Sequence, residues 1–266
     1  MNLPFAKLPI WFDPAGLRTD LESIASDSWL PHLSEFVHAG ACTAVAMRSR
    51  GGTSDDLAAW GPAREFRNTP LAAQCPHIMA GVDTFELAKK SVHLVRLGAG
   101  ARLREFRAVE LGIAPGELRI HVPVVTGNDV ELIAADRCLT AREGEAWCIA
   151  PAQTCRMINR GIDGCVFLVI DGVVNDWAHA LLQRAAQEIV GACSEPVGAA
   201  SFRAFRDRVF DHPALQARLA DITRPDQFFE AVVTAGTELG FAFDSIDVES
   251  ALNRSRHDWM MRTVAL

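Results

Sequence analysis

The sequence lacks the features that mark a membrane or secreted protein. No apolar stretch among its 266 residues approaches the ~20 residues that a membrane-spanning helix needs. The first residues contain no basic segment followed by an apolar run, which is the pattern of a secretory signal. We therefore expect a cytoplasmic protein with no membrane partner.

Clusters of basic residues are also absent. The net charge is −7, and acidic and basic side chains are interleaved along the chain. A nucleic-acid groove is lined by clustered Lys and Arg, because each contact neutralises a phosphate. We expect no nucleic-acid partner.

Cysteine pairs at the spacing CxxC are missing, although the chain contains 7 cysteines. Zinc ribbons and thioredoxin-like redox sites use that spacing, so the sequence argues against both. An odd number of cysteines without a secretory signal fits free thiols in a reducing compartment. The default expectation for each cysteine is a small buried apolar side chain.

The N-terminal region, to about residue 90, combines helical patterns with a long loop. Asp13 is a typical N-cap, and Pro14 suits the first turn of the helix that would follow. A second helix is predicted between Pro76 and Lys89. The stretch from about Arg50 to Pro70, rich in Gly, Ser and Pro, is typical of a loop.

The other two regions differ in the period of their apolar residues. Residues 91–178 show short alternating runs broken by turn residues, which is typical of a sandwich or jelly roll. Beyond them, apolar residues recur every three or four positions, which predicts helices, and Asp244 is suited to cap the last one. We expect an α+β protein with a jelly-roll domain and flanking helices in residues 1–190 and a small all-α domain in residues 195–266.

The segment 154–171 has the pattern of a β-hairpin with its turn near Gly161. With a symmetric register, Cys165 lies opposite Met157, and Cys155 shares their face at about 7–8 Å from Cys165. That separation exceeds the usual reach of a disulfide, and such an apolar face is most often simply core.

Arg119 and His121 alternate with Ile120 and Val122 along a predicted strand. Alternate side chains of a strand face opposite ways, so Arg119 and His121 share one face. From the spacing alone, a polar pocket wall is about as good an interpretation as a satisfied buried pair or an exposed face.

Short motifs at characteristic spacing connect these segments. They are Arg96–Ala101, Arg119–Pro123, Glu143–Trp147, Asn159–Arg160, Leu168–Asp171 and Asn175–Trp177, with Phe12–Asp13, Trp29 and Cys75–His77 upstream. In this order they resemble the catalytic core of the aspartyl/asparaginyl β-hydroxylases, in particular the bacterial amino-acid hydroxylases of the proline type. The resemblance covers about the first two thirds of the chain.

The resemblance implies a double-stranded β-helix with a cupin-like core. In that family a His-x-Asp pair and a distal His hold Fe(II), and an Arg binds 2-oxoglutarate. Iron needs lone pairs from imidazole and carboxylate with open positions for cosubstrate and oxygen, and a carboxylate suits the fork of a guanidinium. Arg119 and His121 match family residues that help to hold the cosubstrate.

This sequence departs from the family at the metal and cosubstrate positions. Phe106 and Ala108 stand where the His-x-Asp pair belongs, and Cys155 stands at the position of the distal His. Cys165 replaces the Arg. Since benzyl and methyl groups have no lone pair to donate, we predict no metal site and no bound cofactor.

An alignment error does not account for the loss. No His occurs in residues 97–118 or in residues 144–170, so no shift restores either histidine ligand. His93 lies just upstream, and a packed or surface role is more common for such a residue than metal binding.

The candidate ligand-binding residues are Arg119, His121, Phe106, Cys155 and Cys165. Arg119 and His121 could bind a carboxylate or another anion, and Phe106 could fill part of the volume that iron occupies in the family. The catalytic residues are unknown. Cys155, Cys165 and His121 are weak candidates, because a reactive thiol needs a pKa lowered by a nearby cation or imidazole.

The C-terminal segment 201–259 carries a second set of spaced residues. They are Phe205, Asp211, Leu215, Leu219, Phe228, Ala235, Gly240, Phe241 and Phe243. The segment resembles the Nif11-like module of bacterial ribosomal-peptide leader regions. The resemblance implies a docking or peptide-recognition element, and the alternative is a helical cap on the barrel. The many aromatic residues favour docking to the barrel, a homodimer or a biosynthetic partner.

Several functions are compatible with the sequence. The first is a degenerate hydroxylase homologue that binds a small carboxylate, an amino acid or a peptide without redox chemistry. The second is an enzyme. It would be either a dioxygenase that hydroxylates an amino acid or peptide with Fe(II) and 2-oxoglutarate at a non-standard metal site, or a metal-independent catalyst on the same barrel. The third is an interaction protein with a filled barrel.

Overall fold

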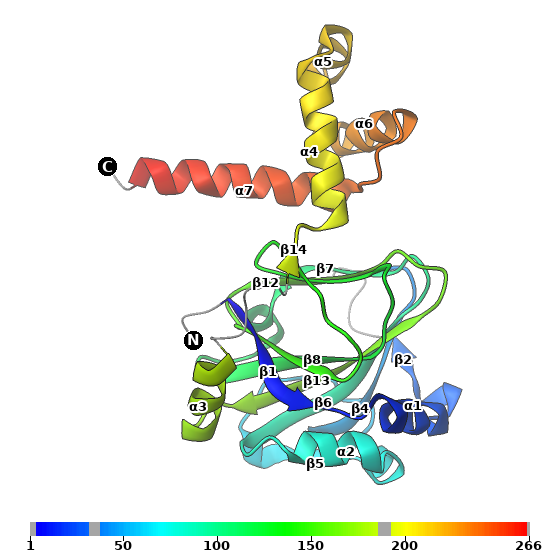
Figure 1. The fold of residues 1–266 in the computed structure, drawn as a ribbon, viewed down its shortest axis with the longest axis vertical. Helices are drawn as coiled ribbons and strands as arrows, with labels where there is room; N and C mark the ends of the chain where they lie inside the picture. The colour runs from blue at the N-terminus through cyan, green and yellow to red at the C-terminus, as the bar shows by residue number, and fades with distance from the viewer. Residues whose placement is uncertain (1–3, 32–37, 186–192, 265–266) are drawn as a thin grey trace. The chain divides into compact units, whose positions relative to one another are not determined.

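The chain folds into two compact units, Met1–Ser194 and Glu195–Leu266. The computed structural model describes residues 4–31, 38–185 and 193–264 (Figure 1). Each unit has a hydrophobic core of its own.

A large antiparallel sheet forms one layer of the first unit (Figure 1). Its strands are β1 (Phe5–Trp11), β2 (Leu30–Pro31), β4 (Cys42–Arg50), β5 (Phe66–Asn68), β6 (Ala88–Leu97), β8 (Glu117–Val125), β11 (Glu145–Ile149) and β13 (Cys165–Val173). They follow the order β1-β11-β8-β13-β6-β4-β2, and β5 pairs with β4.

A smaller antiparallel sheet forms the second layer. Its strands are β3 (His38–Ala39), β7 (Arg102–Arg107), β9 (Val130–Ala134), β10 (Arg137–Leu139), β12 (Thr154–Asn159) and β14 (Cys193–Ser194). Their order is β14-β10-β9-β12-β7-β3.

From β6 to β13 the chain passes repeatedly between the two sheets in the manner of a jelly roll, with β9 and β10 forming a hairpin within the small sheet. In the large sheet, the first strand β6 pairs with the last strand β13, which also pairs with β8. In the small sheet, the second strand β7 pairs with β12, which also pairs with β9. This nested pairing is the double-stranded β-helix, so the predicted α+β class with a jelly-roll core is confirmed.

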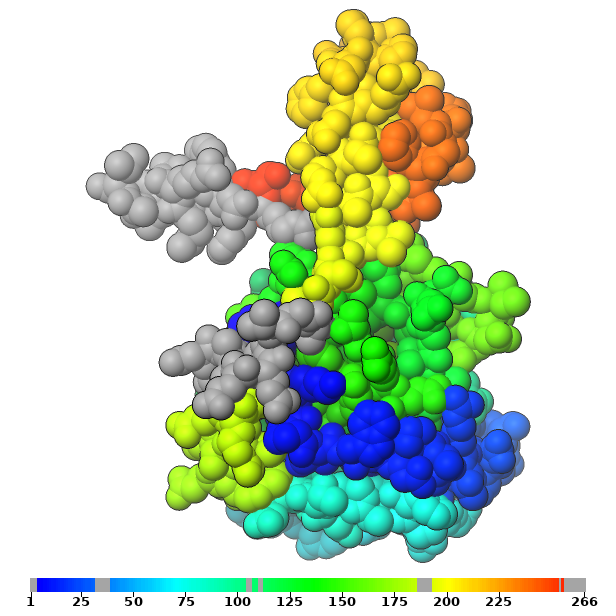
Figure 2. All heavy atoms as spheres, viewed as in Figure 1, coloured from blue at the N-terminus to red at the C-terminus, as the bar shows by residue number. Residues whose placement is uncertain are grey.

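Three helices cover the outer face of the large sheet: α1 (Pro14–Ser23), α2 (Pro76–Asp83) and α3 (Asp176–Ala185). Side chains of β8 such as Ile120 and Val122 pack in the same cluster as Leu17 of α1, Ile78 of α2 and Leu181 of α3. In the space-filling view, α1 and α2 line one side of this unit (Figure 2). Because strand side chains alternate, Arg119 and His121 point to the opposite, inner face.

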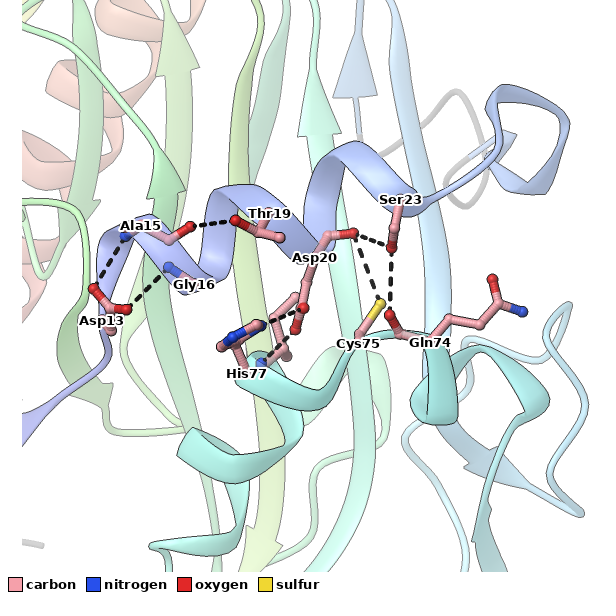
Figure 3. A network of polar contacts seen from close by, with 10 residues as sticks. Asp13, Ala15, Gly16, Thr19, Asp20, Ser23, Gln74, Cys75 and His77 are labelled. Carbon is pink, nitrogen blue, oxygen red and sulfur yellow. Dashed lines mark hydrogen bonds and ion pairs between the residues drawn. The ribbon is translucent and has the colours of Figure 1, made fainter.

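The predicted N-terminal cap is confirmed. The Asp13 carboxylate accepts hydrogen bonds from the backbone N–H groups of Ala15 and Gly16 at 3.2 and 3.1 Å (Figure 3). The second helix starts at Pro76 as predicted but ends at Asp83, because the chain enters β6 at Ala88.

Strands β1 and β4 have no counterpart among the elements predicted from the sequence. The middle of β4 is buried on both faces. Its sequence therefore lacks the alternation of apolar and polar residues that is typical of a half-exposed strand. β1 contains Pro9, which cannot donate to a neighbouring strand. It is tolerated because β1 lies at an edge of the large sheet, where β11 is its one partner among the described strands.

The predicted hairpin in residues 154–171 is wrong. β12 and β13 belong to different sheets, so the turn between them carries the chain across the barrel. Asn159 holds this crossing, since its side-chain nitrogen donates to the carbonyl oxygens of Leu97, Gly98 and Asp163. An arch replaces the hairpin because these contacts fix the last residue of β12 to the end of β6.

Four helices form the second unit: α4 (Val197–Phe210), α5 (Pro213–Ala220), α6 (Pro225–Glu238) and α7 (Ser245–Val264). Phe205, Leu219, Val232, Ala235, Phe243 and Val248 form its buried core. Asp244 caps α7 as predicted, by accepting the N–H groups of Ile246 and Asp247. Among the described residues, no helix is long and apolar enough to cross a lipid bilayer.

Candidate functional site

Arg119 and Asp171 form a buried ion pair between β8 and β13. The strand register places the two residues opposite each other. Arg119 Nε lies 2.7 Å from Asp171 Oδ1 and Nη2 lies 2.9 Å from Oδ2, with the two side chains 7% and 0% exposed. Burial lowers the pKa of Arg119, but the Asp171 charge and hydrogen bonds outweigh it and raise the pKa, so the guanidinium keeps its charge.

His121 follows on the same inner face of β8. It lies opposite Trp147 of β11 and Val169 of β13. The residue is 1% exposed, and its Nδ1 atom is buried with no hydrogen-bond partner among the described residues. Burial, and next the charge of Arg119, lower the pKa of His121 to about 3, so the ring is neutral at pH 7.

His93 of β6 lies in the same row of the sheet, because Val169 is the register partner of both His93 and His121. It is buried, and its Nδ1 atom lies 2.9 Å from the hydroxyl of Ser91. The sequence interpretation of His93 as a packed histidine agrees with this position. The two histidines are separated by one strand, which is about 9–10 Å between backbones.

Cys155 and Cys165 both belong to the apolar cluster inside the barrel, together with Phe167 and Met157. Burial raises the pKa of the Cys155 thiol to about 12, although the Arg119 charge acts in the opposite direction. Burial likewise raises the pKa of Cys165 to about 12. Both groups are thiols at neutral pH, whereas a nucleophilic role needs a lowered pKa.

Of the three residues at the family's metal-ligand positions, two lie opposite each other on neighbouring strands and the third packs elsewhere. The backbone of Phe106 lies opposite Cys155 on neighbouring strands. The Phe106 side chain lies outside the described part of the structure. Ala108 begins the short 3-10 helix η4 (Ala108–Leu111) and packs in a small separate cluster with Ala59 and Ile113.

The donors of the barrel do not fit a ferrous ion. Across residues 4–31, 38–185 and 193–264, no group of three or more His, Cys, Asp or Glu side chains is arranged to hold a metal. Cys155, the donor at the distal-histidine position, carries a proton at neutral pH. Asp171 has both carboxylate oxygens engaged by Arg119. We therefore derive no reaction step through iron.

A second buried ion pair lies near the first and was not predicted. Lys90 Nζ contacts both carboxylate oxygens of Glu117 at 2.7 Å, and the Lys90 side chain is almost completely buried. The pairing role of Asp171 was also missed. A charged residue at the end of an apolar strand was the available signal in both cases, but its partner depends on the strand register.

No protein-family model and no curated protein matches the chain. Among solved structures, it is similar to a 2OG-Fe(II) oxygenase family oxidoreductase from Burkholderia pseudomallei, with 11% identity over 66% of this chain and 89% of that one, at a TM-score of 0.47. It is also similar to a prolyl-4-hydroxylase from Pseudomonas putida, with 11% identity over 61% of this chain and 86% of that one, at a TM-score of 0.41.

A cupin-like protein from Thermotoga maritima is also similar, with 11% identity over 57% of this chain and 90% of that one, at a TM-score of 0.27. At these identities the comparisons concern the fold alone. The jelly-roll assignment rests on the strand order of the two sheets.

Proposed function

We propose that this chain is a degenerate homologue of the aspartyl/asparaginyl β-hydroxylases that binds a small carboxylate, an amino acid or a peptide inside the barrel without redox chemistry. The observation that carries this proposal is the buried, unpartnered Nδ1 atom of His121 beside Arg119. A buried polar atom without a partner costs about 1–3 kcal/mol, so a ligand that forms a hydrogen bond with it would be favoured.

The hydrogen-bonding groups left over on β8 favour an acceptor as the ligand. Asp171 occupies Nε and Nη2 of Arg119, and Nη1 makes no hydrogen bond to any described residue. A neutral His121 carries one ring N–H. A carboxylate or an amide carbonyl can accept from both side chains at once, since they lie about 7 Å apart along one strand face.

The charge balance of the barrel argues for weak discrimination between an anion and a neutral acceptor. Arg119 is compensated by Asp171, and His121 is uncharged at pH 7. An amide carbonyl of a peptide therefore competes with a free carboxylate more effectively than it would beside an unpaired guanidinium.

Calorimetric titration of metal-free protein tests the proposal. Succinate, proline and a short N-acetylated peptide amide are the probes, and we expect at least one to bind with a Kd in the millimolar range or tighter. His121→Leu removes the ring donor and should weaken that binding by about tenfold or more. His212→Leu, on the exposed surface of the second unit, is the matched control and should bind as the original chain does.

Absence of binding by every probe, or equal binding by His121→Leu, would contradict the proposal. Release of succinate from 2-oxoglutarate in the presence of Fe(II) would contradict the part that excludes redox chemistry and would favour a dioxygenase with a non-standard metal site.

A further inference from the structure

A pocket of about 730 Å³ lies at one end of the barrel, entirely within the first unit. Four segments enclose it: the 3-10 helix η4, the turn that leads into β8, the loop after β11 and the exposed side of α3. Its volume is in the range of small-molecule sites. Neither His121 nor Arg119 lines it, so it is separate from the proposed barrel site.

Most of the pocket wall is apolar. Val109, Pro115, Leu118, Pro151, Val174 and Leu182 supply this surface. The backbone there is already satisfied: Val109 N–H donates to Pro151 O, and Val174 N–H donates to Gly116 O. The wall therefore favours an apolar body and offers few unpaired backbone groups to a polar ligand.

The formal charge on the pocket wall is negative. Glu117 is the single ionic side chain among the described lining residues, and neither Lys nor Arg lines the pocket. His179 and Gln183 lie one helical turn apart on α3 and face the same pocket. An anionic ligand would find no cation on the pocket wall, because the Lys90 ammonium that pairs with Glu117 is itself buried and does not line the pocket.

Glu117 retains capacity to accept a hydrogen bond. Lys90 Nζ contacts both oxygens from the core side, and the Ala114 N–H donates to Oε2 at 2.9 Å. A carboxylate offers about four acceptor positions, so these three contacts do not exhaust it. The Glu117 side chain is 11% exposed, which leaves part of it accessible from the pocket.

We infer that this pocket binds a small, mainly apolar molecule that carries an amine. The apolar body packs between η4 and α3, and the amine donates to the Glu117 carboxylate. The class differs in charge from the carboxylate proposed for the barrel interior, so the two sites can be distinguished by their ligands.

Titration with three matched probes tests this inference: phenethylamine, phenylethanol and phenylpropionate. We expect phenethylamine to bind at least about tenfold more tightly than phenylpropionate, and phenylethanol to lie between them. The order should be the same in His121→Leu, because His121 belongs to the other site. Equal or tighter binding of the acid, or no measurable binding of the amine, would overturn the inference.

Val109→Trp locates the binding, because Val109 is partly exposed at the pocket and an indole there fills its volume. We expect a loss of phenethylamine affinity of about tenfold or more. Ile162→Trp is the control, since Ile162 is 91% exposed and does not line the pocket. Unchanged binding by Val109→Trp, or the same loss in Ile162→Trp, would also overturn the inference.

Discussion

At the scale of single residues, Arg119 and Asp171 decide the electrostatics of the barrel interior. Each charge is removed from water, and the bidentate contact compensates part of the lost hydration. In the family that the sequence resembles, the arginine at the position of Arg119 helps to bind an anionic cosubstrate. Here the contact with Asp171 holds the Arg119 side chain in place. Asp171 orients the guanidinium and leaves Nη1 outside the pair.

Removing one member of this pair should be costly. Asp171→Asn leaves the buried Arg119 charge uncompensated, and we expect the free energy of unfolding in urea to fall by about 3–5 kcal/mol. The double variant Arg119→Met/Asp171→Leu should lose less than the single variant, because no isolated charge remains.

The exposed pair Arg218–Glu238 supplies the comparison. Glu238→Ala should cost no more than about 1 kcal/mol, since exposed ion pairs are screened by solvent. A loss for Asp171→Asn as small as that for Glu238→Ala would show that the Arg119 pair is not buried in solution.

His121 predicts a specific pH dependence of stability. Its pKa is about 3 in the folded chain against an ordinary value of 6.5, so between these values the unfolded chain binds a proton that the folded chain does not. Stability is therefore undiminished by this group above pH 6.5 and falls as the pH drops towards 3. The slope from this residue is at most about 1.4 kcal/mol per pH unit.

Urea unfolding at several pH values between those limits measures the effect. His121→Leu should lose less stability on acidification than the original chain, whereas the exposed His212→Leu should follow the original chain. Parallel curves for the original chain and His121→Leu would contradict a neutral buried His121.

At the scale of elements, Asp20 joins α1 to the start of α2 (Figure 3). This buried carboxylate lies 2.8 Å from His77 Nδ1 and accepts the N–H of Ile78 at 2.7 Å. The backbone groups at the start of α2 thus find a partner on another helix. A local capping pattern in the sequence could not predict this contact, because 58 positions separate Asp20 from Ile78.

Asp20→Ala should lower the free energy of unfolding by about 1–3 kcal/mol, because it leaves a buried N–H without an acceptor. Glu22→Ala is a matched control on the exposed side of the same helix and should change stability by less than about 0.5 kcal/mol. Chemical denaturation compares the two, and equal stabilities would contradict the role of Asp20.

The arch between β12 and β13 could not be predicted from the sequence. The two apolar runs have the pattern of a hairpin, and a turn of that length is compatible with a hairpin and with an arch. The choice depends on Asn159, whose side chain reaches the end of β6 some 60 residues earlier. Long-range contacts of this kind are not visible in local periodicity.

At the scale of the whole molecule, the alternation of short apolar runs in residues 91–178 predicted a sandwich or jelly roll, and the family resemblance favoured the jelly roll that the structure shows. The N-terminal strands β1 and β4 were missed, because one contains a proline and the other is buried on both faces. The structure places the backbones of Phe106 and Cys155 opposite each other on neighbouring strands, a pairing that the sequence did not predict. The ion pairs were not predicted, because they depend on which strands become neighbours.

The proposed binding of a ligand in the barrel without iron can be checked by quantifying the iron retained after anaerobic loading with Fe(II) and 2-oxoglutarate and subsequent desalting. We expect far less than one iron atom per chain, at the level of a His121→Leu sample treated in parallel. One iron atom retained per chain, held by side chains of the barrel, would contradict it.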